Sequence, residues 1–371
     1  MFPALLIQWE NDLGWSRSKL TAALTLAILM SAVAAPVAGR IIDRGRGPLM
    51  MSLSAAFGGG LLIFLSVVTE PVWFYVIWAG IGVSLAGCLY EPCFALITRA
   101  LGSSARQSIL TVTLIAGFAS TLSFPGAHTL EAAVGWRYTL IIFGSIVIIL
   151  GAPLLAVGAG AVERMGPPTT QNPVAKSQST KSYFQTPVFW LLGIGFACVA
   201  LVHGILLHHL LPLLHERNLD ADIAVTAAAF IGPMQVAARL AMMTGLRNIA
   251  THALIIGCFS ILILAIAVLS QSGTDYFLLG VFVLFFGSAY GMVSILRPVA
   301  AHELLGGDAY GAKSGILASL YLGAAASAPY LGSVIWSIGG YELVILLVLL
   351  TALSGLSFYL YAFRTASQAA R

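Results

Sequence analysis

The chain has 371 residues, of which 59% are hydrophobic and 9% are charged, and its formal net charge is +4. Soluble domains carry about 25% charged residues, so this composition excludes an ordinary soluble protein and indicates a helical membrane protein with many spans. The lysines and arginines lie in loops and not on one basic face, which argues against a nucleic-acid partner.

Uncharged or nearly uncharged stretches predict eleven complete membrane spans. A helix needs about 20 apolar residues to cross the hydrocarbon core of a bilayer. Arg239 interrupts the span at 223–246, which is therefore the least regular. The predicted spans are 18–41, 49–69, 71–98, 107–130, 138–161, 187–213, 223–246, 252–271, 276–297, 313–337 and 342–363.

The first charged turn after a span, Gly39–Pro48, carries Asp43 among Arg40, Arg44 and Arg46. A carboxylate in such a turn can cap the N-terminus of a neighbouring helix or pair with an arginine. We expect it to act as a latch that holds two helices together in one conformation and releases them in another. The alternative is an ordinary positively charged cytoplasmic loop.

The distribution of basic residues predicts the orientation in the membrane. With the 39–48 turn in the cytoplasm, 14 lysines and arginines lie inside and 4 lie outside. The C-terminus is then cytoplasmic. The longest polar segment, 163–186, contains three prolines and many small polar residues and is predicted to be a flexible linker. It divides the chain into an N-terminal bundle at 1–162 and a C-terminal bundle at 187–371.

Several of these segments resemble the major facilitator superfamily. The pattern of Gly39, Asp43 and Arg44 is similar to the signature that follows the second helix in that family. It departs from the family pattern because Gly45 and Arg46 follow directly, without the usual intervening residue. Three further segments add to the resemblance: Leu-Gly-Trp-Ser-Arg at 13–17, Gly-Trp-Arg at 135–137, and the run at 231–239. The segments at 13–17 and 231–239 are most similar to the oxalate/formate antiporter and monocarboxylate-porter branch.

The resemblance implies an all-α integral membrane fold of two six-helix bundles, with twelve helices in the full plan. Met1–Trp9 is too short to cross the membrane, so we expect helix 1 to be incomplete here; a genuine eleven-span protein is the alternative. The resemblance further implies a monomeric secondary transporter in a bacterial-type inner membrane, which works by alternating access.

Glu91 is the sharpest candidate for transport chemistry, because ionisable side chains within spans are costly. Pro92 follows it and removes a backbone donor, so a local kink is expected. The functional interpretation is a proton-coupling or substrate-binding carboxylate, and the structural one is a partner for Arg99 or Arg297. The neighbouring hydroxyl of Tyr90 is a second candidate.

Two other helices carry candidate groups. His203 lies deeper in its span than His208 and His209, and it is either a proton-responsive group or a histidine whose bonds are satisfied between helices. Gln235 and Arg239 share one helix face, and in monocarboxylate-porter relatives an arginine of this helix is associated with the substrate carboxylate. Arg239 is either such a ligand or a structural arginine.

We therefore predict a secondary transporter that moves a small organic anion, such as a monocarboxylate, by proton symport or by antiport. Efflux of drugs or lipophilic metabolites is the first alternative, and a non-transporting sensor or assembly protein is the second. We expect no enzyme activity, no cofactor and no metal, since no activated serine, paired carboxylates or metal-spaced His/Glu set is present in the sequence. No phosphate-binding glycine loop with a following lysine occurs either, so a gradient would drive transport.

Overall fold

The computed structural model describes residues 2–166 and 186–369 of the chain. Within these ranges it is helical, with short turns between helices and no strand. The expectation of an all-α fold is confirmed. The predicted linker lies mostly at 167–185, outside the described residues.

Contacts between residues group the chain into two compact units. Unit 1 comprises 1–105 and 111–177, and it also includes the late segment Asp308–Ser319. Unit 2 comprises the short segment Arg106–Leu110 together with 178–307 and 320–371. The bundle boundaries at 162 and 187 stay a prediction, since this grouping follows packing and not the order of the chain.

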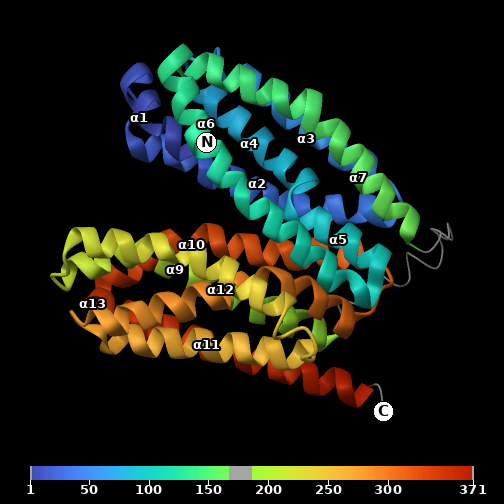
Figure 1. Cartoon of the computed structure of the whole chain (residues 1–371), viewed down its shortest axis with the longest axis vertical. Coiled ribbons are helices and arrows are strands. Elements are labelled where there is room, and N and C mark those ends of the chain that lie inside the picture. Colours follow the sequence, from blue (N-terminus) through green and yellow to red (C-terminus); the bar gives the residue numbers. More distant parts are fainter. Residues whose placement is uncertain (1, 167–185, 370–371) are drawn as a thin grey trace. The chain divides into compact units, whose positions relative to one another are not determined.

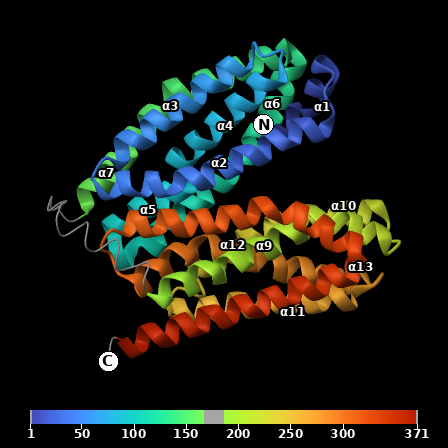
Figure 2. The same cartoon turned by 180° about the vertical axis from the view of Figure 1, so that it is seen from behind.

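The early helices of the chain belong chiefly to unit 1. α3 runs beside α4 and α7, and α2 lies against α4 and α5 (Figures 1 and 2). A five-residue π-helix at Val147–Gly151 joins α6 to α7. The helices are α1 (Phe2–Leu13), α2 (Arg17–Asp43), α3 (Gly47–Leu65), α4 (Pro71–Cys88), α5 (Tyr90–Leu101), α6 (Ala105–Ile146) and α7 (Ala152–Met165).

The later helices build unit 2. α12 is flanked by α10 and α11, and α9 contacts both α10 and α12 (Figure 1). The helices are α9 (Pro187–Glu216), α10 (Ala221–Met243), α11 (Thr251–Ser272), α12 (Tyr276–Leu305) and α13 (Tyr310–Ala369), of which the first ten residues belong to unit 1.

In the described residues, nine helical stretches are long and apolar enough to cross a membrane. Two of the predicted boundaries fall at glycines where α6 and α13 are broken by non-helical backbone. Gly135 has φ +79° and divides α6, and Gly340 has φ +67° and divides α13. Only glycine adopts this backbone readily. The 60 residues of α13 would extend to roughly 90 Å as one straight helix, so the break separates two spans.

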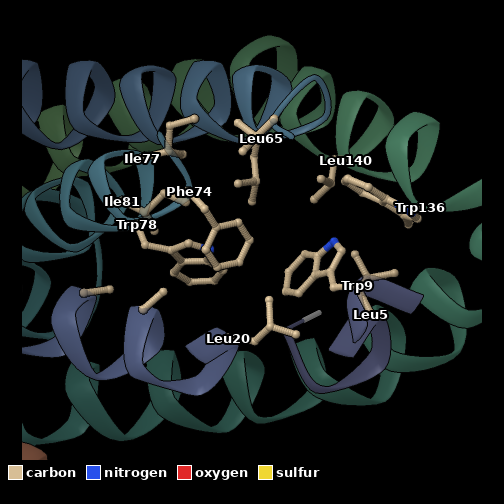
Figure 3. Packing of buried hydrophobic residues seen from close by; sticks show 13 residues of the cluster. Leu5, Trp9, Leu20, Leu65, Phe74, Ile77, Trp78, Ile81, Trp136 and Leu140 are labelled. Atoms are coloured by element: carbon tan, nitrogen blue, oxygen red, sulfur yellow. The ribbon is translucent and has the colours of Figure 1, made fainter. Parts of the chain in front are cut away.

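An aromatic core holds one end of unit 1 together (Figure 3). The fully buried ring of Trp9 meets Phe74 edge-on at 5.6 Å between centroids, and it meets Trp78 and Trp136 at 6.3 Å. The Trp136 indole donates a hydrogen bond of 2.6 Å to Asp12. The Gly-Trp-Arg segment at 135–137 therefore provides both a helix break and a tie between α6 and α1.

Candidate functional site

The predicted helix cap is present in unit 1. Asp43, the last residue of α2, accepts a 2.7 Å hydrogen bond from the backbone N–H of Gly311 on one carboxylate oxygen. The other oxygen accepts a 2.7 Å hydrogen bond from the N–H of Ala312. Both donors lie in the first turn of α13, where N–H groups have no partner inside their own helix and the helix dipole favours negative charge. A carboxylate from a residue 268 positions away thus caps α13.

Glycines allow α13 to approach α2 at this cap. A Cβ atom added to Gly39 would overlap the carbonyl oxygen of Gly311, and one added to Gly315 would overlap the carbonyl of Ala35. The Ser319 hydroxyl, one turn further along α13, hydrogen-bonds to the carbonyl of Ala32. Small residues permit such close helix packing in membrane proteins. The two helices therefore touch along three turns, with Asp43 at one end.

The arginines of the predicted gate motif have a different environment. Arg40, Arg44 and Arg46 are exposed, and Arg44 and Arg46 lie in the turn between α2 and α3. The buried cation near the cap is instead Lys313, which lies within electrostatic range of both Asp43 and Asp308. Of the predicted motif, Gly39 and Asp43 make the helix contact, while Arg44 and Arg46 face solvent.

A second set of polar contacts ties α2, α5 and α7 near the same turn. Arg99 donates a 2.7 Å hydrogen bond to the carbonyl of Ile42, the residue before Asp43, and it pairs with Glu163 of α7. The sequence marked Arg99 only as a possible partner for Glu91. Partners 64 residues apart carry no local signal, so this pair was missed.

Glu91 lies at a helix break and not in a continuous span. α4 ends at Cys88 and α5 begins at Tyr90, with Leu89 in an extended conformation between them. The expected effect of Pro92 is thus confirmed. Glu91 is half-buried in the first turn of α5. A negative charge at this position interacts favourably with the dipole of the helix, whose N-terminus is partially positive.

A small cavity of about 10 Å³ lies beside Glu91, between α2, α5 and the start of α13. A cavity of this size holds about one water, which is too small for an organic solute. Tyr90 is 43% exposed, and its ring packs on Phe94 at 5.3 Å between centroids. In this geometry Glu91 has room for a proton or a water beside it, and Tyr90 is not part of the same cavity lining.

His203 is deeply buried in unit 2. Its ring stacks on Tyr290 at 3.3 Å and on Phe286 at 4.8 Å between centroids, both from α12. Its Nδ1 atom has no hydrogen-bond partner among the described residues. A buried nitrogen without a hydrogen-bond partner lowers the stability of the fold by about 1–3 kcal/mol. The alternative that His203 is a histidine with all of its hydrogen bonds satisfied therefore does not describe its Nδ1 atom.

Gln235 and Arg239 lie together where α10 crosses α12. A Cβ atom at Gly291 would clash with the backbone of Gln235, so the two helices are in close contact. The Arg239 Nε donates a hydrogen bond of 3.3 Å to the Gly291 carbonyl. Arg239 as a whole is half-buried at this crossing.

Arg297 is the most buried arginine of unit 2. Its side chain is 7% exposed, and its guanidinium lies 4.4 Å from the centre of the Tyr321 ring. Stacking on an aromatic face holds the planar guanidinium in a fixed orientation. Its position at the end of the predicted span 276–297, directly before Pro298, is typical of an arginine at the membrane surface. The burial of Arg297 distinguishes it from that class.

Arg106, in the short early segment that belongs to unit 2, carries a further cation that the sequence did not mark as a candidate. Arg106 donates 3.0 Å hydrogen bonds to the carbonyls of Leu246 and Ile249, in the turn between α10 and α11. Burial lowers the pKa of the Arg106 guanidinium, and the Glu303 carboxylate partly offsets this shift. Arg106 thus holds the turn between α10 and α11 through backbone carbonyls.

No group of three or more His, Cys, Asp or Glu side chains that could hold a metal ion occurs in the part of the chain that the structure describes.

Solved structures with the same fold are transporters. A single-substitution variant of the E. coli fucose:proton symporter FucP superposes with a TM-score of 0.71 at 14% identity, covering 97% of this chain and 94% of that one. A bacterial homologue of the iron transporter ferroportin, in an outward-facing state, gives 0.70 at 14% identity, with 97% and 98% covered. The human organic anion transporter TETRAN gives 0.67 at 15% identity, with 96% and 89% covered.

A sequence comparison with curated proteins found no match. The family profile described as Major Facilitator Superfamily matches residues 1–329, which is most of the chain. The predicted resemblance is therefore confirmed at the level of the superfamily, and its narrower branch stays a prediction. The chain belongs to the Major Facilitator Superfamily of transmembrane transporters.

Proposed function

We propose that this transporter moves a small organic anion, and that the arginines of unit 2 bind its negative charge. The observation that carries the proposal is the charge distribution inside unit 2. Arg297 lies eight residues before the end of α12 and Arg239 lies one turn before the end of α10. The acidic side chains among the described residues of this unit lie at or within two residues of helix ends or breaks. These acidic residues are Glu216, Asp220, Asp222, Asp275, Glu303 and Glu342.

A cationic span interior favours an anionic solute. Guanidinium groups bind carboxylates through two parallel hydrogen bonds. The guanidinium of Arg297 has a fixed orientation on the Tyr321 ring. Arg239 also contacts α12, the helix of Arg297, through its hydrogen bond to the Gly291 carbonyl. Gln235, one turn before Arg239 on α10, adds an amide that can donate to a carboxylate.

Glu91 and the Asp43 cap supply the proposed coupling and gating. A half-buried carboxylate beside a water-sized cavity suits the uptake and release of a proton. We propose that the Asp43 cap of α13 forms in one transport state and opens in another. With the basic residues inside, as the charge bias predicts, this cap lies at the cytoplasmic face of a multi-pass membrane protein.

The test is solute exchange in proteoliposomes with single arginine variants. Arg297→Gln and Arg239→Gln should each lower the exchange of labelled lactate at least roughly tenfold, since a charge-assisted hydrogen bond is lost. Arg364→Gln removes an equal charge from an exposed position near the end of α13 in the same unit and should leave exchange within twofold. Unchanged lactate exchange in both interior variants would refute the arginine site.

Efflux of lipophilic metabolites is the second candidate, and one surface feature favours it. An apolar groove of about 360 Å³ lies between α10 and α12, lined by residues that include Phe230, Met234 and Leu279. Competition of lactate exchange by lipophilic cations, with a matching uptake of the cation, would favour this candidate over the anion.

A further inference from the structure

A pocket at the C-terminal end of α9 lies apart from the arginines discussed above. Its volume is about 610 Å³, within the range of sites for small organic ligands. α9 contributes one wall, and residues 329–341 of α13, on both sides of the break at Gly339 and Gly340, contribute the other. The residues that the argument needs are His208, His209, Glu216, Ser333, Trp336 and Tyr341.

The only full charge on the pocket lining is the exposed carboxylate of Glu216. In the described part of the chain no lysine or arginine pairs with it. The neighbouring Arg217 is engaged elsewhere, since it pairs with Glu342 at 2.9 Å and donates a 2.6 Å hydrogen bond to the Leu269 carbonyl. With neutral histidines, the pocket is therefore negative.

Hydrogen bonds fix which ring nitrogens of the histidines carry the proton. His208 Nδ1 lies 2.8 Å from the Gly204 carbonyl, which can only accept, so this nitrogen donates. The Nε2 atom of the neutral His208 ring is then an acceptor, and no described residue donates to it. His209 Nε2 likewise donates to the Pro329 carbonyl at 3.0 Å, and its Nδ1 accepts from the Tyr341 hydroxyl at 3.3 Å.

The remaining hydroxyl of the lining is also occupied. Ser333 donates to the Pro329 carbonyl at 3.1 Å. Among the lining groups with assigned hydrogen bonds, the positions left for a ligand are acceptors: a Glu216 oxygen and His208 Nε2. The third histidine of the lining, His215, presents one donor and one acceptor nitrogen. A carboxylate ligand needs donors, whereas an ammonium group needs these acceptors.

Two aromatic rings stand beside the carboxylate. The Trp336 and Tyr341 rings lie 6.0 Å apart between centroids at an angle of 40°, and Trp336 is 45% exposed. The Trp336 indole donates a 3.0 Å hydrogen bond to one Glu216 oxygen, which orients the carboxylate and leaves the other oxygen open. Aromatic faces attract cations through their quadrupole.

We propose that this pocket binds a solute with a protonated primary or secondary amine attached to an apolar body. The ammonium donates to Glu216 and to His208 Nε2, and the apolar body packs on Trp336 and Tyr341. This site is independent of the anion site of the proposed function, because it uses neither Arg239 nor Arg297. By the charge bias of the loops it faces the non-cytoplasmic side.

The test measures binding by calorimetry to the purified full chain in detergent. The probes share one ring and differ in charge: 2-phenylethylammonium, neutral 2-phenylethanol and anionic phenylacetate. We expect the ammonium to bind at least roughly tenfold more tightly than the alcohol, and phenylacetate not to compete with it. Glu216→Gln should weaken ammonium binding roughly tenfold or more, and Trp336→Leu should weaken it severalfold.

Asp222→Asn is the matched control, since it removes another exposed carboxylate of unit 2 outside the pocket, and it should leave binding within twofold. Trp336→Phe keeps a ring but loses the indole donor, and it provides a second readout if Glu216→Gln does not fold. Equal binding of alcohol and ammonium, tighter binding of phenylacetate, or unchanged binding in both Glu216→Gln and Trp336→Leu would overturn the proposal. Arg297→Gln should leave ammonium binding unchanged. A failure of the proposed anion site can therefore be told apart from a failure of the proposed amine pocket.

Discussion

The carboxylate of Asp43 caps α13 through the backbone of Gly311, a residue 268 positions further along the chain. The contact joins the end of one predicted span to the start of another within unit 1. Because the donors are backbone N–H groups, the cap does not depend on the identity of a partner side chain. It depends on Asp43 and on glycines that let the two helices approach.

Replacing Asp43 by alanine should destabilise the protein by about 1–2 kcal/mol, because two hydrogen bonds and a favourable helix-dipole interaction are lost. The measurement is thermal unfolding in detergent. Glu70→Gln is the control, since Glu70 precedes α4 without a side-chain cap bond and is exposed. An Asp43→Ala protein as stable as the control would show that the cap contributes nothing.

Gly39→Ala should cost about 1–3 kcal/mol and impair transport, because the added methyl group forces α2 and the start of α13 apart. Gly60→Ala is the matched control in α3, where an added Cβ meets nothing within 4 Å. That change should be neutral or slightly stabilising. The pair is compared by Tm in detergent and by lactate exchange, and equal behaviour of the two variants would contradict the close crossing.

Sequence patterns predicted the spans and a helix-capping role for Asp43, but they did not predict which helix Asp43 caps. Hydropathy locates helices because burial in lipid acts on whole segments. Pairs such as Arg99 with Glu163, or Arg106 with Leu246, join distant segments, and the partners of Arg106 are backbone carbonyls of no particular residue type. The sequence carries no local signal for such contacts.

The break before Glu91 was predictable because Pro92 removes one backbone donor, whereas the orientation of His203 was not. Its stacking on Tyr290 and Phe286 follows from the packing of α9 against α12. Likewise, only burial distinguished Arg297 from an arginine at the membrane surface. These properties arise from tertiary packing.

His203→Phe separates a structural role from a chemical one. Phenylalanine keeps the stack with Phe286 and Tyr290 and removes the unpaired Nδ1 nitrogen, so the variant should be as stable as the native protein or more stable by about 1–3 kcal/mol. If the imidazole takes part in transport, lactate exchange falls while Tm is kept. Full exchange with a higher Tm would assign His203 to packing alone.

Glu91→Gln should abolish accumulation driven by a pH gradient while sparing exchange of labelled lactate, because the amide cannot take up and release a proton. Its first-turn position in α5 adds a smaller effect on stability, about 0.3–1 kcal/mol. Lactate uptake is measured in the same proteoliposomes with a pH gradient, which reports accumulation, and without one, which reports exchange. Gradient-driven accumulation at the native rate would remove Glu91 from coupling.

Lactate counterflow in proteoliposomes that contain the native chain tests most directly whether the protein transports an organic anion. Phenylethylammonium counterflow and empty liposomes are the comparisons. Transport of an organic anion through the arginine site predicts lactate counterflow that Arg297→Gln abolishes and Arg364→Gln preserves. Absence of lactate and other carboxylate counterflow from a folded, reconstituted protein would contradict it.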